Sequence, residues 1–506
     1  MAEPHQTATG SFLGLRACLP VFSTSVVLIV AFVVATLAAG DDAAAAFKAV
    51  QGAISESWGW FFVLTANVLL GFAVYLLFSR FGKIRLGGEE AKPEFSTISW
   101  IAMLFSAGMG IGLVFWAVAE PLYHFSSPPV PPLDPTAKHR LAQEAMGLTF
   151  LHWGLHPWAI YAVLGLGLAY AGFNKGLPLS IRSIFHPLLG DRVNGWMGHV
   201  IDTVAILAIL FGVATSLGLG VSQVNAGLDA SISTGQSLGI KLWLIAGITA
   251  IATISVVTGV KKGIRFLSEL NMALAGIIIL IVVVAGPTLA ILNGYFQNFG
   301  YYIQNFARLA SWGETYTGGQ WQNGWTVFYY AWWISWAPFV AMFIARISKG
   351  RTVREFTMAV LIIPTLIGFF WLTVFGGTAL NLEMTGGAAL LAALKDGVEN
   401  ALFALLSALP GAEITIVLAT IVIVTFFVTS SDSGSLVIDM IAAGGDPNPP
   451  VQQRIFWAVT EGVVAAVLLV GGGLTALQTA SIVTGLPFAV VLLLVCLSLL
   501  RWFREA

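Results

Sequence analysis

The stretch Gly108-Met109-Gly110-Ile111-Gly112-Leu113-Val114-Phe115-Trp116, which runs on to Glu120-Pro121, decides how this chain folds. It places three glycines on alternate positions inside an apolar segment long enough to cross a membrane. Glycine in a helix interior costs about 1 kcal/mol relative to alanine, so the triplet indicates bent or unwound backbone. In lipid, such backbone survives only where protein buries it or where it lines a cavity, and interrupted helices hold substrate and ions in secondary transporters. Close helix packing through small residues is the alternative.

The composition is that of a membrane protein. Hydrophobic residues make up 57% of the 506 residues and charged residues only 10%, whereas a soluble domain carries roughly 25% charged residues. The formal net charge of -1 argues against a nucleic-acid partner. Cys18 and Cys496 lie near opposite ends of the chain, so neither a disulfide framework nor a metal spacing is expected. The first residues lack a cleavable secretory signal, and the apolar run from about Leu19 is expected to be a retained helix.

The chain contains about twelve apolar segments of membrane-spanning length. They cover residues 18–39, 58–79, 98–120, 145–171, 199–224, 241–259, 267–291, 325–346, 355–379, 412–440, 453–471 and 475–501. With the N-terminus in the cytoplasm, about three quarters of the 24 lysines and arginines fall on the cytoplasmic side, as the positive-inside rule requires. We therefore predict a multi-pass protein of the plasma (bacterial inner) membrane with both termini in the cytoplasm.

Aromatic residues gather inside two of these segments. In the fourth segment, Trp153, Trp158 and Tyr161 fall within one arc of about 140° at about 100° per residue, and Pro157 among them is expected to bend the helix. The eighth segment carries a second arc, formed by Trp325, Tyr329, Trp332, Trp333, Trp336 and Phe339. Aromatic faces bind quaternary ammonium ions well. Packing, or a belt at the membrane interface, is the alternative.

A third group of polar residues lies in the tenth segment, Thr425-Phe426-Phe427-Val428-Thr429-Ser430-Ser431-Asp432-Ser433-Gly434. A lone hydroxyl in lipid commonly bonds back to the preceding turn, but grouped hydroxyls can face an ion. Hydroxyl and carbonyl oxygens suit a hard cation such as Na⁺. We expect Asp432 to cap or pair locally.

Three stretches resemble the betaine/choline/carnitine transporter family: GMGIGLVFWAVAEPLYHF at 108–125, the segment 152–161, and WWISWAPFVAMFIARISKGRTVREF at 332–356. The resemblance covers about residues 18–501. It implies an all-α polytopic membrane protein with about twelve transmembrane helices and the leucine-transporter fold. The N-terminal tail and two leading helices would lie in residues 1–97. Two inverted five-helix repeats would follow, in residues 98–291 and 325–501. A short cytoplasmic tail would occupy residues 502–506. The aromatic segment 292–324 would be an interfacial amphipathic helix at the subunit contact of a homotrimer.

The resemblance also implies a substrate site. The family's aromatic box maps onto Trp153, Trp158, Tyr161, Trp333 and Trp336. Trp332 and Phe339 would act as gates. Backbone amides at Gly108, Met109 and Gly110 are expected to bind the substrate carboxylate, since freed amides at a helix terminus attract anions.

Two sodium sites follow from the same comparison. The first maps onto the backbone carbonyls of Ser106, Met109 and Phe426 and the hydroxyls of Thr429 and Ser430. A second is expected at Thr215 and Ser216 on the fifth helix. Sodium would be the coupling ion, and no other cofactor is expected.

Two further positions bear on the substrate. Proton-coupled choline carriers of the family resemble one another in having an acidic residue where this chain has Gly112, and sodium-independent carnitine exchangers have an arginine where it has Asn271. We therefore predict a Na⁺-coupled symporter that imports a zwitterionic quaternary-ammonium osmolyte, most simply glycine betaine, by alternating access. A carrier for choline, carnitine, proline betaine, dimethylsulfoniopropionate or ectoine, proton-coupled or exchanging, is the alternative.

Other classes of protein fit less well. A channel needs a continuous polar pore lining, which the bulky apolar segments do not provide. An enzyme would have to use His152, His156 and Glu120, and histidines near a bent helix are more often hydrogen-bonded structure. We therefore expect no enzymatic activity. Because the end of the sequence carries few basic residues, we also expect that osmotic stress does not strongly activate transport.

Overall fold

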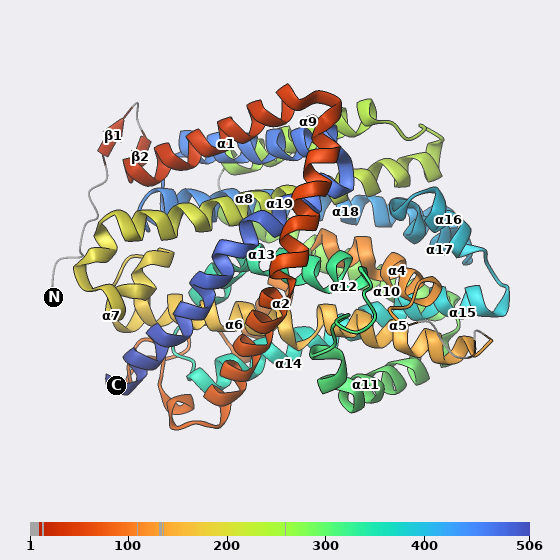
Figure 1. Ribbon diagram of the computed structural model, residues 1–506, viewed down its shortest axis with the longest axis horizontal. Coiled ribbons are helices and arrows are strands. Elements are labelled where there is room, and N and C mark those ends of the chain that lie inside the picture. The colour runs from red at the N-terminus through yellow and green to blue at the C-terminus, as the bar shows by residue number, and fades with distance from the viewer. Residues whose placement is uncertain are drawn as a thin grey trace.

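The computed structural model describes residues 10–12, 15–108, 110–130, 134, 136–258 and 260–505. Apart from a short hairpin of β1 (Gly10–Phe12) and β2 (Leu15–Ala17), these residues form helices joined by loops (Figure 1). The longer helices are α1 (Leu19–Ala39), α2 (Ala43–Phe78), α3 (Thr97–Gly108), α4 (Ile111–Ser126), α5 (Lys138–Trp153), α6 (Leu155–Ala169), α8 (Trp196–Ile232), α9 (Leu238–Thr258), α10 (Val260–Ala285), α11 (Thr288–Ala310), α13 (Thr326–Arg346), α14 (Val353–Leu372), α15 (Thr378–Thr385), α18 (Ala412–Ala442) and α19 (Val451–Glu505). The shorter helices are α7 (His186–Leu189), α12 (Trp321–Gly324), α16 (Leu390–Asp396) and α17 (Ala401–Ser407).

Every predicted apolar segment lies on one or two of these helices, so the all-α class is confirmed. Within the described ranges, eight helices, or nine if one bent pair counts as a single span, are long and apolar enough to cross a membrane. Several stretches in that count contain more than one helix. One joins α1 and α2, another joins α5 and α6, and in α19 Gly472 (φ 169°) and Gly473 (φ 57°) interrupt the helical backbone. A total of twelve spans stays a prediction.

The fourth predicted segment breaks in the turn before Pro157. Helix α5 ends at Trp153 and α6 begins at Leu155, with Gly154 (φ -95°, ψ -130°) between them. A proline cannot bond the carbonyl four residues before it, which here is that of Trp153, so the break lies where Pro157 is expected to bend the helix. Gly154 is required at the break because a Cβ there would lie 2.5 Å from the Phe150 carbonyl oxygen and 2.8 Å from Phe369 Cζ.

The predicted interfacial segment begins in a helix that turns sharply away from its neighbour. The chain bends by 111° between residues 269–285 of α10 and helix α11. Helix α11 lies at the periphery, at the lower right of the view (Figure 1). A sharp turn of this kind fits a helix that runs along a membrane surface. The inverted repeats, the role of segment 292–324 in a trimer and the location of the termini stay predictions.

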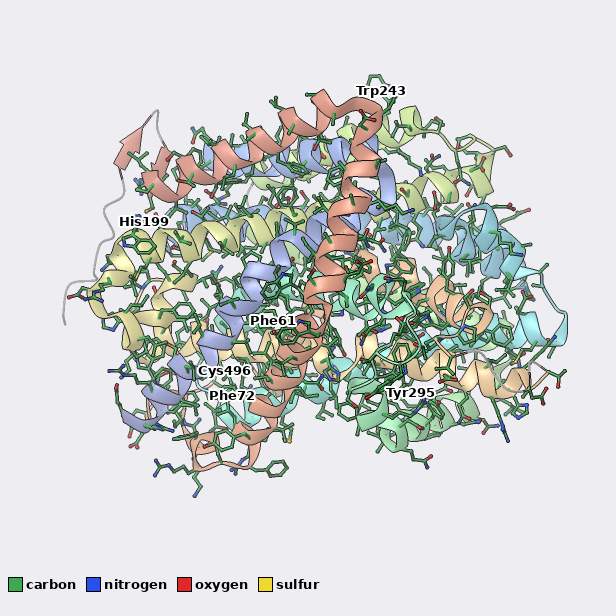
Figure 2. The ribbon with its side chains drawn as sticks, in the orientation of Figure 1. Phe61, Phe72, His199, Trp243, Tyr295 and Cys496 are labelled. Carbon is green, nitrogen blue, oxygen red and sulfur yellow. The ribbon has the colours of Figure 1, made fainter. Side chains whose placement is uncertain are left out.

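The core lies where α8, α13, α18 and α19 pack on one another and on α6. Large apolar side chains also cover the outside, as Trp243 does on α9, where it is 81% exposed (Figure 2). Lipid can solvate such a surface, whereas the core has to satisfy its own polar groups. A buried ion pair between Asp202, near the start of α8, and Arg182, in the segment before it, shows how the core satisfies its polar groups. Arg182 Nε lies 3.1 Å from Asp202 Oδ2, and the Ser180 hydroxyl donates to the same carboxylate.

Candidate functional site

The glycine-rich stretch interrupts a helix, as predicted. Helix α3 ends at Gly108 and α4 begins at Ile111, while Gly110 between them is fully extended (φ -150°, ψ -179°). The N-cap residue Gly110 has no side chain, and no side chain of the described residues accepts from the first backbone N–H groups of α4, so those of Ile111 and Gly112 can meet an anion. Met109 lies outside the described residues, as do the side chains of residues 105–108.

The same glycines also allow tryptophan rings to approach the backbone. A Cβ built on Gly110 would lie 3.0 Å from Trp336 Cη2. A Cβ on Gly112 would come closer to Trp332 Cη2 than real contacts allow, and would lie 3.2 Å from two further atoms of that ring. Helix interruption and close packing therefore both account for this stretch, and the packing partners are rings of α13.

The five predicted box residues come from two helices, α6 and α13, that pack against each other, with Trp153 at the end of α5. All five side chains are buried. Trp153 meets Trp333 edge-on, with ring centroids 4.8 Å apart and planes at 70°. Trp158 meets Tyr161 in the same way at 5.6 Å. Among the ring contacts of the described residues, the five box rings form three groups: Trp153 with Trp333, Trp158 with Tyr161, and Trp336, which contacts Phe339.

Two box residues carry polar atoms without a partner. The Tyr161 hydroxyl and the Trp336 indole Nε1 are buried and make no hydrogen bond to any described residue. A buried donor without a partner costs about 1–3 kcal/mol. Both groups are therefore candidates for hydrogen bonds to a bound ligand.

The two predicted gate residues lie beside the box. Trp332 stacks on Trp333 at 4.9 Å with an interplanar angle of 11°, and its Nε1 donates to the Gly212 carbonyl on α8 at 3.3 Å. Phe339 meets Trp336 edge-on at 5.3 Å. The stack couples Trp332 directly to a box residue.

The described half of the predicted sodium site lies on α18. The Thr429 hydroxyl lies 3.0 Å from the Thr425 carbonyl oxygen and 3.1 Å from that of Phe426, and it accepts a hydrogen bond from Asn271 Nδ2 at 3.3 Å. Asn271 Oδ1 is buried and has no hydrogen-bond partner in the described part of the chain. Ser430 is 8% exposed. The predicted ligand atom of Ser106 is its backbone carbonyl, which belongs to α3, whereas Met109 lies outside the described residues.

The residues of the predicted second sodium site lie on α8. The Thr215 hydroxyl is close to three oxygens: the Phe211 carbonyl at 2.8 Å, the Leu477 carbonyl at 2.8 Å and Ser481 Oγ at 3.0 Å. Ser216 donates to the Gly212 carbonyl at 3.3 Å. These hydrogen bonds link α8 to α19. The binding of a sodium ion by these oxygens stays a prediction.

Asp432 pairs with a neighbouring helix, as expected of a locally bonded carboxylate. The Ser255 hydroxyl of α9 donates to Asp432 Oδ2 at 2.5 Å. Ser431 donates to a second buried carboxylate, Glu461 of α19, at 3.1 Å. Both carboxylates are almost fully buried, and the helices α9, α18 and α19 meet through these contacts.

The most extensive polar cluster was not predicted as part of the site. Glu120 on α4 is fully buried and accepts four hydrogen bonds. Its Oε1 accepts from His152 Nδ1 at 2.7 Å and from His124 Nε2 at 3.1 Å. Its Oε2 accepts from Trp153 Nε1 at 2.7 Å and from the Tyr329 hydroxyl at 2.5 Å. A carboxylate inside an apolar segment is the sequence signal that could have identified it.

The network around Glu120 has the geometry of hydrogen bonds and not of a metal centre. One ligand atom each from Glu120, His124 and His152 lie within 4.8 Å of one another. However, both histidines approach the same carboxylate oxygen at N–H···O distances. His152 also uses its second nitrogen, Nε2, at 3.0 Å from the Thr326 hydroxyl. His156, the third histidine considered above, lies apart from this group and bonds Asn67 Oδ1 at 3.3 Å.

Comparison with known proteins gives a consistent result over nearly the whole chain. The family model described as "BCCT, betaine/carnitine/choline family transporter" matches residues 20–506. A glycine betaine/proline/choline transporter of Vibrio parahaemolyticus is 47% identical over 499 residues, which cover 96% of this chain and 90% of that protein. The glycine betaine transporter OpuD of Bacillus subtilis is 43% identical over 455 residues, 89% of this chain and 88% of that protein. An uncharacterized transporter of Mycobacterium tuberculosis is 49% identical over 499 residues, 97% of this chain and 83% of that protein.

Proposed function

Because this chain belongs to the betaine/carnitine/choline transporter family, whose members are transporters and not enzymes, we propose that it is a Na⁺-coupled symporter for glycine betaine. The relatives named for glycine betaine support this substrate. The relative that is also named for choline and proline makes a broader range of small osmolytes the second candidate.

One observation carries the proposal: an anion-binding helix end and a set of aromatic faces lie side by side. The uncapped N-terminus of α4 touches Trp336, because Gly110 lets the indole ring approach its backbone. Glycine betaine carries a carboxylate and a trimethylammonium separated by one methylene. The carboxylate suits the free N–H groups of α4, and the ammonium suits the tryptophan and tyrosine faces.

The unpartnered donors on Tyr161 and Trp336 add to this argument. Both belong to rings of the box, and a ligand carboxylate would accept their hydrogen bonds. A ligand without an anionic end would leave these groups unsatisfied, which disfavours it relative to a zwitterion.

Sodium coupling is supported by the oxygen atoms near Thr429. The hydroxyl of Thr429, the carbonyl of Phe426 and the unpartnered Oδ1 of Asn271 are neutral oxygens of the kind that bind a hard cation. Sodium can drive uptake only if it binds more tightly when substrate is bound, a reciprocal coupling of typically 1–3 kcal/mol.

The test is uptake of glycine betaine into proteoliposomes with and without an inward Na⁺ gradient. We expect gradient-dependent uptake in the wild type, loss of uptake in Trp336→Ala, and loss of the sodium dependence in Thr429→Ala. Two matched controls should keep wild-type uptake: Trp243→Ala, which removes an outward-facing ring, and Thr425→Ala, which removes a hydroxyl one turn earlier on α18.

Each part of the proposal can fail separately. Uptake that is indifferent to sodium would refute the coupling. Uptake of choline or proline with no uptake of glycine betaine would refute the substrate. In both cases the membership of the family would stand.

A further inference from the structure

We propose that Glu120 is a positioning residue of the aromatic box and that its negative charge, passed to the box through Trp153, selects a cationic ligand. This inference rests on the proposed function, since it concerns the same site. It adds a residue that lies outside the rings and the helix end described above.

Glu120 holds the rings through direct bonds on both of its oxygens. Oε2 accepts from Trp153 Nε1 at 2.7 Å and from the Tyr329 hydroxyl at 2.5 Å. Oε1 holds His152, whose backbone carbonyl accepts from Trp333 Nε1 at 2.8 Å. One carboxylate therefore fixes a box residue from each of the two chain segments, Trp153 directly and Trp333 through His152.

We take Glu120 as ionised, because four hydrogen-bond donors surround its two oxygens and stabilise the carboxylate. His152 is assigned the neutral tautomer that donates from Nδ1 to Glu120, so that Nε2, 3.0 Å from the Thr326 hydroxyl, accepts from that group. His124 donates from Nε2, while its Nδ1 has no partner among the described residues. No lysine or arginine of the described ranges pairs with Glu120.

A buried negative charge beside the box has a direct effect on ligand choice. In a low-dielectric interior, charge–charge attraction is much stronger than in water, so a cation gains from Glu120 even without touching it. A charge-assisted bond from an indole N–H to a carboxylate also shifts electron density toward the ring. The face of Trp153 becomes more negative, which strengthens its attraction for an ammonium.

The decisive measurement compares a cationic ligand with its neutral-headed isostere. Glycine betaine and 3,3-dimethylbutanoate have the same shape and the same carboxylate, but only the first carries a quaternary ammonium. We expect Glu120→Gln to weaken the binding of glycine betaine by about tenfold or more, and that of 3,3-dimethylbutanoate by less than about threefold. Glu413→Gln, which neutralises an exposed acid of α18, is the matched control and should change neither affinity.

A purely structural role predicts a different result. If Glu120 only supports the fold of the site, Glu120→Gln weakens both ligands by the same factor, and the electrostatic part of the proposal is wrong. Unchanged binding of glycine betaine would overturn the whole proposal. A Trp153→Phe variant keeps an aromatic face but loses the N–H. It should lose part of the discrimination between the two ligands, and if Glu120 acts through Trp153, its effect should not add to that of Glu120→Gln.

A measurement without ligand separates this inference from the proposed function. In ¹⁵N-labelled protein, the indole N–H signal that disappears in Trp153→Phe belongs to Trp153. We expect that signal to move upfield in Glu120→Gln, because the charge-assisted bond is lost, and to move much less in Thr326→Val, which perturbs only His152. An unmoved signal would refute the bond between Glu120 and Trp153. If the wild type binds no glycine betaine, the proposed substrate fails while this signal still decides the positioning role.

Discussion

Replacing Gly112 by alanine tests whether the glycine-rich stretch exists to accommodate the tryptophan rings of α13. The added Cβ would meet Trp332 Cη2 at less than contact distance, and would lie 3.2 Å from both Cζ2 and Cζ3. Carbon atoms in contact prefer about 3.5–4.0 Å, so the ring has to retreat by about 1 Å. Since Trp332 stacks on Trp333, the displacement reaches the box.

The expected effects on stability and on binding differ in size. Overpacking costs about 1–3 kcal/mol, and the better helix propensity of alanine offsets up to about 1 kcal/mol of this. The free energy of unfolding should therefore fall by about 0–2 kcal/mol. A displaced ring can lose a cation–π contact of up to about 2 kcal/mol, which corresponds to a loss of affinity for glycine betaine of up to about 30-fold.

The assay combines binding of glycine betaine to purified protein with thermal unfolding in the same detergent. Gly71→Ala in α2 is the matched control, because a Cβ at that helical glycine meets nothing within 4 Å. It should leave binding unchanged and stabilise the protein slightly. A folded Gly112→Ala variant that binds like the wild type would refute the argument that this glycine makes room for Trp332.

Three further changes should act on stability alone, each measured by thermal unfolding of the purified protein. Asp202→Asn leaves the buried Arg182 without its charge partner and should destabilise by about 3–5 kcal/mol; a loss below about 1 kcal/mol would contradict this. Thr352→Ala removes the capping box that Thr352 forms with Glu355 at the start of α14 and should cost about 0.5–2 kcal/mol, whereas Thr352→Ser should cost less. Gly473→Ala forces a side chain into a left-handed conformation (φ 57°) at the break in α19 and should cost about 1–3 kcal/mol; an unchanged midpoint would show that this backbone can relax.

Periodicity and glycine content predicted the parts of the fold that depend on a single segment. The apolar segments lie on helices, and the break between Gly108 and Ile111 falls within the glycine triplet. Both features follow from local physics, because a helix in lipid needs an apolar surface and glycine is the cheapest place to interrupt it. The break near Trp153 lies one turn before Pro157, as expected of a proline, and Gly154 adopts the backbone that the break requires.

Features that depend on how helices rotate against each other were not predictable in the same way. Glu120 and His152 are 32 residues apart, and the bond from Trp333 to the His152 carbonyl joins residues 181 apart. The sequence alone does not say which face of α4 meets α5. The two aromatic arcs could therefore be predicted residue by residue. Their arrangement could not, namely that Trp153 packs against Trp333 and Trp158 against Tyr161.

The charges around the proposed site give a physical reason for a zwitterionic substrate. With its histidine partners in the neutral form, Glu120 contributes one buried negative charge. In the proposed mechanism a sodium ion would offset that charge, and a betaine would add no net charge to the site. Choline would leave that site with an excess positive charge in a low-dielectric interior, which is costly unless another carboxylate is added. At Gly112 such a carboxylate would have to displace Trp332, so a change to a cationic substrate at that position would require the Trp332 ring to move as well.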